Sequence, residues 1–211
     1  MSKEPAKREL KQERAARTRV EILEAAITLF ARRGFLATTM ADLARAIHMT
    51  PGALYWHFPT KEDLLLAALD ELHQRYLTAF EDVLATAPTD SARERLQAFR
   101  RHTHAFLKEH REYGIFFGML TAEAADTHER VAEAIRDKLG HYTRLLEELI
   151  LEGQRTGELR QDLDAARMAH AVFSAYLGML MHQNLFRASL DYDPLSTALD
   201  ALLEGGFLPR G

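Results

Sequence analysis

Residues 50–58 read TPGALYWHF, and this stretch decides the fold. Proline and glycine are the two least favourable residues inside a helix. Both fit if Thr50 is a helix N-cap, because its hydroxyl accepts an otherwise unpaired backbone N–H and Pro51 at the first helical position has no N–H to lose. The sequence therefore predicts a very short helix with small residues at its front and large aromatic residues behind.

The segments on either side of this stretch also read as helices. Apolar residues in 17–33 recur at spacings of three and four, which indicates an amphipathic helix that ends before Gly34. Thr38-Thr39 then predict the cap of a short helix, MADLARAI, followed by a turn at 48–49. Two short helices joined by a tight turn describe a helix-turn-helix.

The rest of the chain has the same helical periodicity and shows no alternating strand pattern. Pro59 ends the short helix, and Thr60 with Asp63 resembles a capping box that opens a long helix over 61–84. A break follows at Pro88–Ser91, and Asp126–Glu129 resembles a second capping box. Further helices are expected at about 91–109, 112–124, 129–152, 164–187 and from 193 to a stop at Gly205-Gly206.

We therefore expect an all-α protein in three parts. Residues 1–16 form a charged tail, either mobile or a frayed extension of the first helix. Residues 17–62 form a three-helix helix-turn-helix domain, and residues 63–211 form a larger helical domain.

Composition limits the function. The chain has 211 residues, of which 47% are hydrophobic, and it has no cysteine, so disulfides, thiolate catalysis and cysteine zinc sites are excluded. No apolar run approaches the ~20 residues that span a bilayer, and the N-terminus lacks a signal peptide's apolar stretch, so we expect a cytoplasmic protein without a membrane partner.

The charge of the chain is unevenly distributed. Residues 1–62 hold 11 Lys and Arg against 7 Asp and Glu, a balance of +4, although the whole chain carries −4. This asymmetry indicates a basic module on an acidic body.

The short helix at 51–57 has the shape that the DNA major groove requires. Small residues at Thr50–Ala53 let the backbone approach the bases. Tyr55, Trp56 and His57 are long enough to reach flanking phosphates, and Lys61 adds a charge near helix N-terminal amides. The alternative is that the aromatic residues are ordinary core and that Lys61 is a solvated lysine.

Residues 18–66 resemble the DNA-binding domain of the tetracycline-repressor (TetR) family, and beyond them the chain resembles it only in being helical and of suitable length. The residues that carry the resemblance are Ala25-Ala26, Phe30, Gly34-Phe35, Thr38-Thr39, Ile47, Gly52, Leu54-Tyr55, His57-Phe58 and Lys61–Leu64.

The resemblance implies a homodimeric repressor that binds a double-stranded, pseudo-palindromic operator and is released by a small effector. It makes residues 17–62 the DNA-binding domain and residues 63–211 the domain for effector binding and dimerisation. It maps phosphate contacts onto Thr38 or Thr39, Thr50, Tyr55, Trp56, His57 and Lys61, and base-proximal positions onto Pro51, Gly52 and Ala53. Two positions depart from the family pattern. His48 stands where the family often has a glycine, and Pro51 cannot donate a hydrogen bond to a base.

Two further sets of residues are candidates in the C-terminal part. An apolar effector pocket would be lined by Phe106, Tyr113, Phe116, Phe117, Met119, Leu120, Tyr142, Phe173, Tyr176 and Met181, for which ordinary core packing is the alternative. A four-helix dimer seam between the helices at 129–152 and 164–187 would use Leu146, Ile150, Ala171, Ala175 and Gly178, for which packing within one subunit is the alternative.

The sequence offers little for an enzyme. The ten histidines do not occur in HxxxH or ExxH spacings, so we expect no metal and no cofactor. A Gly-rich phosphate loop and an evident nucleophile–base pair are both missing, so a helical enzyme or carrier is the weaker alternative. We interpret the chain as a ligand-responsive transcriptional repressor, with activation on the same fold left open.

Overall fold

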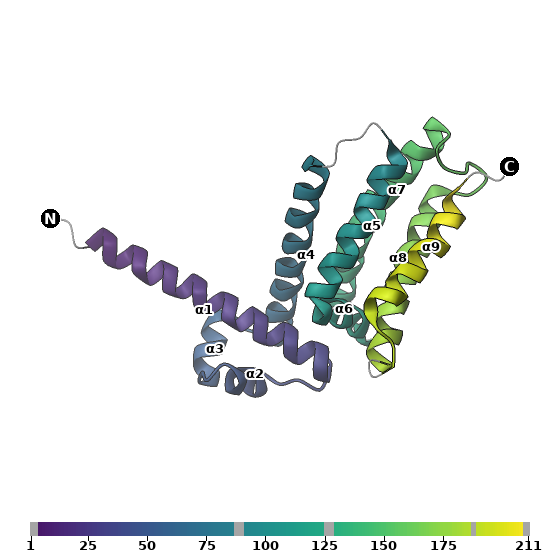
Figure 1. The fold of residues 1–211 in the computed structure, drawn as a ribbon. Helices are drawn as coiled ribbons and strands as arrows, with labels where there is room; N and C mark the ends of the chain where they lie inside the picture. Colours follow the sequence, from purple (N-terminus) through teal and green to yellow (C-terminus); the bar gives the residue numbers. More distant parts are fainter. Residues whose placement is uncertain (1–3, 87–90, 125–128, 187–188, 209–211) are drawn as a thin grey trace.

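The computed structural model describes residues 4–86, 91–124, 129–186 and 189–208. Over these residues the chain is all-α, with nine helices and no strand (Figure 1). The helices are α1 (Glu4–Arg33), α2 (Met40–Ala46), α3 (Pro51–His57), α4 (Lys61–Thr86), α5 (Ala92–Glu109), α6 (Arg111–Ala124), α7 (Glu129–Thr156), α8 (Ala165–Leu185) and α9 (Tyr192–Phe207).

The helix starts confirm the capping signals of the sequence. The Thr50 hydroxyl accepts a hydrogen bond from the Ala53 N–H at 3.2 Å, and Pro51 occupies the first turn of α3. Thr39 caps α2 through a complete capping box with Asp42. Local side-chain chemistry therefore determines where the two short helices begin.

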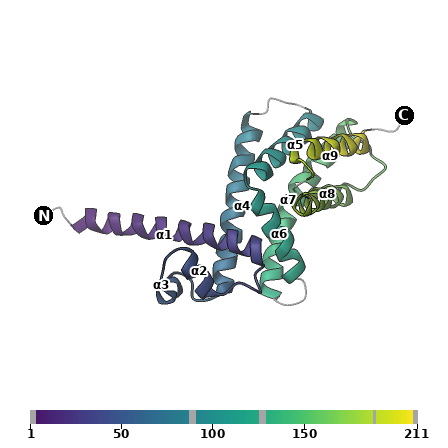
Figure 2. The same ribbon diagram turned by 60° about the horizontal axis from the view of Figure 1, so that its bottom comes forward.

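Helices α1, α2 and α3 form one end of the molecule, which we call the head. In Figures 1 and 2 the N-terminal part of α1 projects well beyond α2 and α3. The segment expected to be a tail is thus helical from Glu4 onward. Inside the head, Leu43 and Leu54 are buried against the C-terminal half of α1.

The head is not packed on itself alone. Its core continues through α4 into α6 and the start of α7, and the rings of Phe30 on α1 and Phe116 on α6 stack 6.2 Å apart. Phe116 is fully buried there, and Leu120, one turn later on α6, is buried in the same core. We expected both residues in the effector pocket, but they join the head to the rest of the molecule.

Helices α5, α7, α8 and α9 form the other end, the body, beside the upper part of α4 (Figures 1 and 2). Helix α9 does not stop at Gly205-Gly206 as expected. It continues to Phe207, whose side chain is buried in the core of the body. The expected break at Pro88–Ser91 and the expected capping box at Asp126–Glu129 lie mostly outside the described residues. Ser91 itself caps α5, since its hydroxyl accepts the Glu94 N–H at 3.2 Å.

Candidate DNA-binding surface and aromatic pocket

The outer face of α3 presents the residues that the sequence assigned to DNA. Thr50, Pro51, Gly52 and Ala53 are all exposed, and an added Cβ atom at Gly52 would have no atom within 4 Å. Leu54 is the side chain of α3 that is fully buried, and it fixes which face of this short helix points outward. The small residues therefore form an open front at which another molecule's surface can come close to the α3 backbone.

The aromatic residues of α3 stand free of the core. Tyr55 is 49% exposed and Trp56 is 76% exposed, which is unusual for large apolar side chains. The indole of Trp56 meets the ring of His57 edge-on at 4.8 Å. Their exposure removes the alternative that Tyr55 and Trp56 are ordinary core residues.

Two other residues expected at the DNA lie elsewhere. Thr38 is fully buried, and its hydroxyl donates to the Gly34 carbonyl oxygen at 2.7 Å, so no phosphate can reach it. Thr39 is exposed and remains a candidate contact. The ammonium of Lys61 points inward and donates to the carbonyl oxygens of Phe35 and Thr38 at 2.7 and 2.9 Å.

One exposed cation beside α3 was missed by sequence reasoning. Arg45 on α2 lies one turn before the helix-turn-helix turn, and its side chain is 77% exposed. It pairs with Asp42 at 3.2 Å, an i,i+3 contact of small energetic value. Its position in the last turn of the predicted short helix, just before the turn, could have indicated from the sequence that it lies near the DNA.

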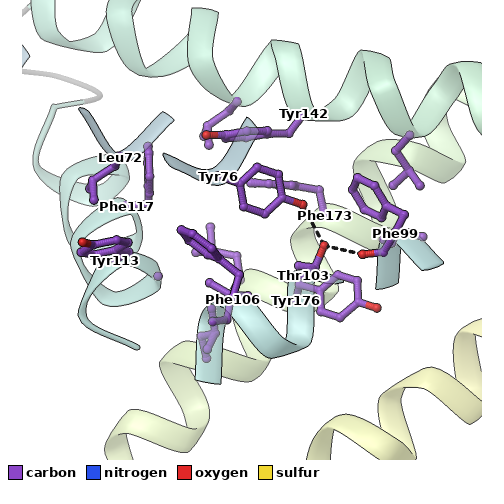
Figure 3. Close-up of a pocket in the computed structure, with 17 residues that line it drawn as sticks. Leu72, Tyr76, Phe99, Thr103, Phe106, Tyr113, Phe117, Tyr142, Phe173 and Tyr176 are labelled. Carbon is purple, nitrogen blue, oxygen red and sulfur yellow. Dashed lines mark hydrogen bonds between the residues drawn. The ribbon is translucent and has the colours of Figure 1, made fainter. Parts of the chain in front are cut away.

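An aromatic pocket lies between α4, α6 and three helices of the body, α5, α7 and α8 (Figure 3). Its volume is about 90 Å³, and its walls are almost entirely apolar. Eight aromatic rings line it, and six of them were expected from the sequence. The eight are Tyr76, Phe99, Phe106, Tyr113, Phe117, Tyr142, Phe173 and Tyr176.

The tyrosine rings line the pocket, and their hydroxyls are bonded to other side chains of the protein. The Tyr76 hydroxyl is 2.8 Å from the Thr103 hydroxyl, which donates in turn to the Phe99 carbonyl oxygen (Figure 3). The Tyr176 hydroxyl donates to Asp200 at 2.9 Å. Burial raises the pKa of both tyrosines, so their hydroxyls stay protonated.

Two more tyrosines connect the pocket to α4. The Tyr142 hydroxyl lies 2.9 Å from the Nδ1 atom of His73, and the Tyr113 hydroxyl accepts a hydrogen bond from Arg75 at 2.7 Å. Burial, with help from Lys138 and His141, lowers the pKa of His73 to about 4, so this imidazole is neutral near pH 7.

Several expected pocket residues do not line it. Phe116 and Leu120 belong to the core between head and body, as described above. Met119 and Met181 are partly buried but lie outside the pocket walls; Met181 packs against Gly118. The lining residues that sequence reasoning missed come from all five helices. They are Leu72 and Tyr76 on α4, Phe99, Thr103 and Leu107 on α5, Gly114 on α6, Leu139 and Leu146 on α7, and Val172, Leu177 and Leu180 on α8.

The residues expected in a dimer seam divide into two groups. Leu146 and Ile150 on α7 are buried inside the subunit, and Leu146 lines the pocket, so they are not available to a partner. Ala171 and Gly178 lie on the exposed side of α8 and Ala175 is half-buried there. Large exposed apolar residues on these two helices include Leu185 on α8 and Leu202 on α9, each at 76%.

Known proteins resemble both ends of the chain. Residues 22–68 match the model of "Bacterial regulatory proteins, tetR family", and residues 92–199, half of the chain, match "Tetracyclin repressor-like, C-terminal domain". The HTH-type transcriptional regulator TtgR of Pseudomonas putida is 31% identical over 192 residues, which cover 85% of this chain and 86% of the relative. The chain belongs to the tetR family of bacterial transcriptional regulators.

A second relative and a solved structure are also similar to this tetR-family chain over most of its length. The probable acrEF/envCD operon repressor of Escherichia coli is 29% identical over 88% of this chain and 84% of the relative. A putative transcriptional regulator from Saccharomonospora viridis, solved in complex with choline, has the same fold, with a TM-score of 0.79 at 22% identity over 92% of this chain and all of that one. Family membership thus confirms the regulator interpretation, while the assignment of individual contacts rests on the geometry above.

The described residues also bear on metals and membranes. In these four ranges of the chain, no cluster of three or more His, Asp or Glu side chains could hold a metal ion. No helix within the same ranges is long and apolar enough to cross a membrane.

Proposed function

We propose that this tetR-family chain is a repressor that binds a pseudo-palindromic operator as a homodimer and leaves it when a small apolar or amphipathic effector occupies the aromatic pocket. The observation that carries the proposal is the path of α4. It begins three residues after Phe58, which is buried in the head, and it contributes Leu72 and Tyr76 to the pocket wall. A shift of α4 would therefore change the geometry of the head and of the pocket together.

The DNA side of the proposal rests on α3. Its open front, from Thr50 to Ala53, would lie against base edges in the major groove, and Thr39, Tyr55, Trp56 and His57 would contact phosphates beside it. Pro51 offers no hydrogen-bond donor, so van der Waals contact and DNA shape would carry part of the specificity. The E. coli relative named as a probable operon repressor supports repression as the direction of control.

The dimer would form through α8 and α9. Helix α8 exposes the small residues Ala171 and Gly178 and the large Leu185, α9 exposes Leu202, and an added Cβ atom at Gly178 meets no atom within 4 Å. Small residues let helices of a partner approach closely. In such a dimer two recognition helices would lie ~34 Å apart, the spacing of one DNA turn.

Fluorescence anisotropy tests the DNA part directly. The labelled duplex would be the region upstream of the gene itself, titrated at several salt concentrations. A dimer that neutralises about eight phosphates should give a slope of log K against log salt near −7. Equal affinity for every duplex, or none in dilute buffer, would overturn the proposal.

The effector part needs a second titration. Uncharged apolar compounds would be added to the preformed complex, with their charged analogues as controls. We expect an effector to weaken DNA binding by ~5–150-fold, the usual range of such couplings. A variant that fills the pocket, Val172→Phe, should keep DNA binding and lose this response.

A further inference from the structure

Arg75 on α4 stands between the pocket and the head. Its Nη1 atom donates to the Tyr113 hydroxyl on α6 at 2.7 Å and to the carboxylate of Glu24 on α1. Its Nε atom donates to Glu71, one turn back on α4, at 2.9 Å. One guanidinium thus connects a wall of the pocket, the helix that links both ends, and a helix of the head.

This bridge is partly withdrawn from solvent. The Arg75 side chain is 30% exposed and that of Glu24 is 43% exposed. Burial alone would lower the pKa of Arg75, but its hydrogen bonds with Glu24 and Glu71 outweigh burial and raise it. The charge on Arg75 is therefore permanent, and charge-assisted bonds of this kind are about twice as strong as neutral ones.

The size of the pocket determines what a ligand must do there. A volume of about 90 Å³ is smaller than the ~150 Å³ cavity known to hold a benzene molecule. An effector must therefore push some of the lining rings outward. Among the four tyrosines, Tyr113 is the one whose hydroxyl is bonded to a residue that itself binds the head.

Helix α6 touches the head at a second point. At its other end, Glu123 accepts hydrogen bonds from the backbone N–H groups of Phe35 and Leu36, at 2.7 and 3.2 Å. Tyr113 and Glu123 lie on the same helix, so a displacement that begins at the pocket also acts on the loop between α1 and α2.

We propose that Arg75 is the positioning residue that passes occupancy of the pocket to the head. A ligand that moves the Tyr113 ring removes one partner of Arg75 and weakens its bond to Glu24, which lets α1 and with it α3 change orientation. The inference rests on the proposed function, since it presumes a ligand in this pocket and DNA on α3.

Thermodynamic linkage gives the test. The probe is N-phenyl-1-naphthylamine, an uncharged dye that fluoresces when it leaves water, and the DNA is a duplex that the wild-type protein selects from a random pool. The readout is the factor by which this duplex weakens dye binding, which equals the factor by which the dye weakens DNA binding. Because it is a ratio, this factor does not depend on the basal affinity for either ligand.

Two variants break the bridge from opposite ends. Tyr113→Phe keeps the ring and removes the hydroxyl, and Glu24→Gln removes the carboxylate charge. We expect each variant to reduce the linkage factor by ~2–30-fold, the range for residues that couple two sites. The double variant should lose little more than either single one, because both act through Arg75.

Matched controls separate coupling from packing. Tyr76→Phe removes a pocket hydroxyl that is bonded to Thr103 within the body, and Glu21→Gln removes a carboxylate on α1 that pairs with Arg17. Both controls should keep the wild-type factor. Melting temperatures are measured alongside, since a merely structural role would lower them and leave the factor intact.

The two levels of the proposal fail differently. A wild-type factor well above one with unchanged factors in Tyr113→Phe and Glu24→Gln would overturn the role of Arg75 and leave the effector response standing. A wild-type factor of one would overturn the effector response itself, and the role of Arg75 with it.

Discussion

The Lys61 ammonium lies 2.7 Å from the carbonyl oxygen of Phe35 and 4.2 Å above the centre of the same residue's ring. A second hydrogen bond joins it to the Thr38 carbonyl oxygen. The first residue of α4 is thus fastened to the loop between α1 and α2. Burial lowers the pKa of this ammonium, because the charged form has lost part of its water.

Replacing Lys61 should therefore lower the free energy of unfolding more than it lowers the affinity for DNA. Lys61→Met removes two hydrogen bonds from a charged donor, and we expect a loss of ~1–3 kcal/mol in the free energy of unfolding, measured by urea denaturation. Lys108→Met is the control, since its bridge to Asp193 is largely exposed and is worth at most ~1 kcal/mol. Unchanged stability with weakened DNA binding would instead restore Lys61 as a phosphate contact.

The sequence predicted features that depend on near neighbours. Thr39 and Thr50 cap their helices with residues three positions ahead, so their roles can be read from spacing alone. Phe116 and Phe117 show the limit of such reasoning, because adjacent residues on one helix point to the interdomain core and to the pocket respectively. Which of them faces the pocket depends on where α1 and α4 pack.

Contacts between segments that are distant in the sequence could not be predicted from it either. The bridge from Arg75 to Glu24 spans 51 residues of sequence, and the hydrogen bond from Phe35 to Glu123 spans 88. Nothing in the local pattern of either segment indicates its partner. The pocket was predicted as a cluster of aromatic residues, but its α4 wall, with Leu72 and Tyr76, followed only from the packing of the helices.

The turn of the helix-turn-helix carries a backbone strain that can be relieved. His48 has φ of 55°, in the left-handed region that favours glycine, and it stands where the family often has a glycine. Because glycine adopts this conformation without steric cost, His48→Gly should raise the free energy of unfolding by up to ~1 kcal/mol, offset in part by the greater freedom of glycine in the unfolded chain. A clear fall in melting temperature would show that the His48 side chain has a stabilising contact.

Stability should fall on mild acidification because of His73. Its pKa is about 4 in the folded protein and 6.5 in the unfolded chain, so the unfolded state binds the extra proton first. Stability is therefore full above pH 6.5 and is lost as the pH falls from 6.5 towards 4, by ~2 kcal/mol at pH 5 and ~3 kcal/mol at pH 4 for this residue. His102 and His104, whose pKa values burial also lowers, act in the same direction.

Urea denaturation at pH 8 and pH 5 measures this effect. In the His73→Gln variant, the difference in unfolding free energy between the two pH values should be smaller than in the wild type. His170→Gln, at an exposed position on α8, should keep the wild-type difference. An equal difference in all three proteins would mean that His73 does not lose its proton on folding.

A substitution at the open front of α3 can change DNA binding without changing the stability of the fold. An added Cβ atom at Gly52 meets no atom of the protein, and its φ is not positive, so Gly52→Ala should keep or slightly raise the melting temperature. On DNA the new methyl group would hold the helix away from the bases. Loss of the contacts at one base pair costs ~1–3 kcal/mol, so we expect binding weakened about tenfold. The matched control is Gly140→Ala on α7, a helical glycine whose added Cβ atom would approach only the end of the flexible Arg144 side chain, at 3.2 Å; this variant should fold equally well and bind DNA as the wild type does. If Gly52→Ala binds its duplex with full affinity in anisotropy titrations, the front of α3 does not lie against base edges.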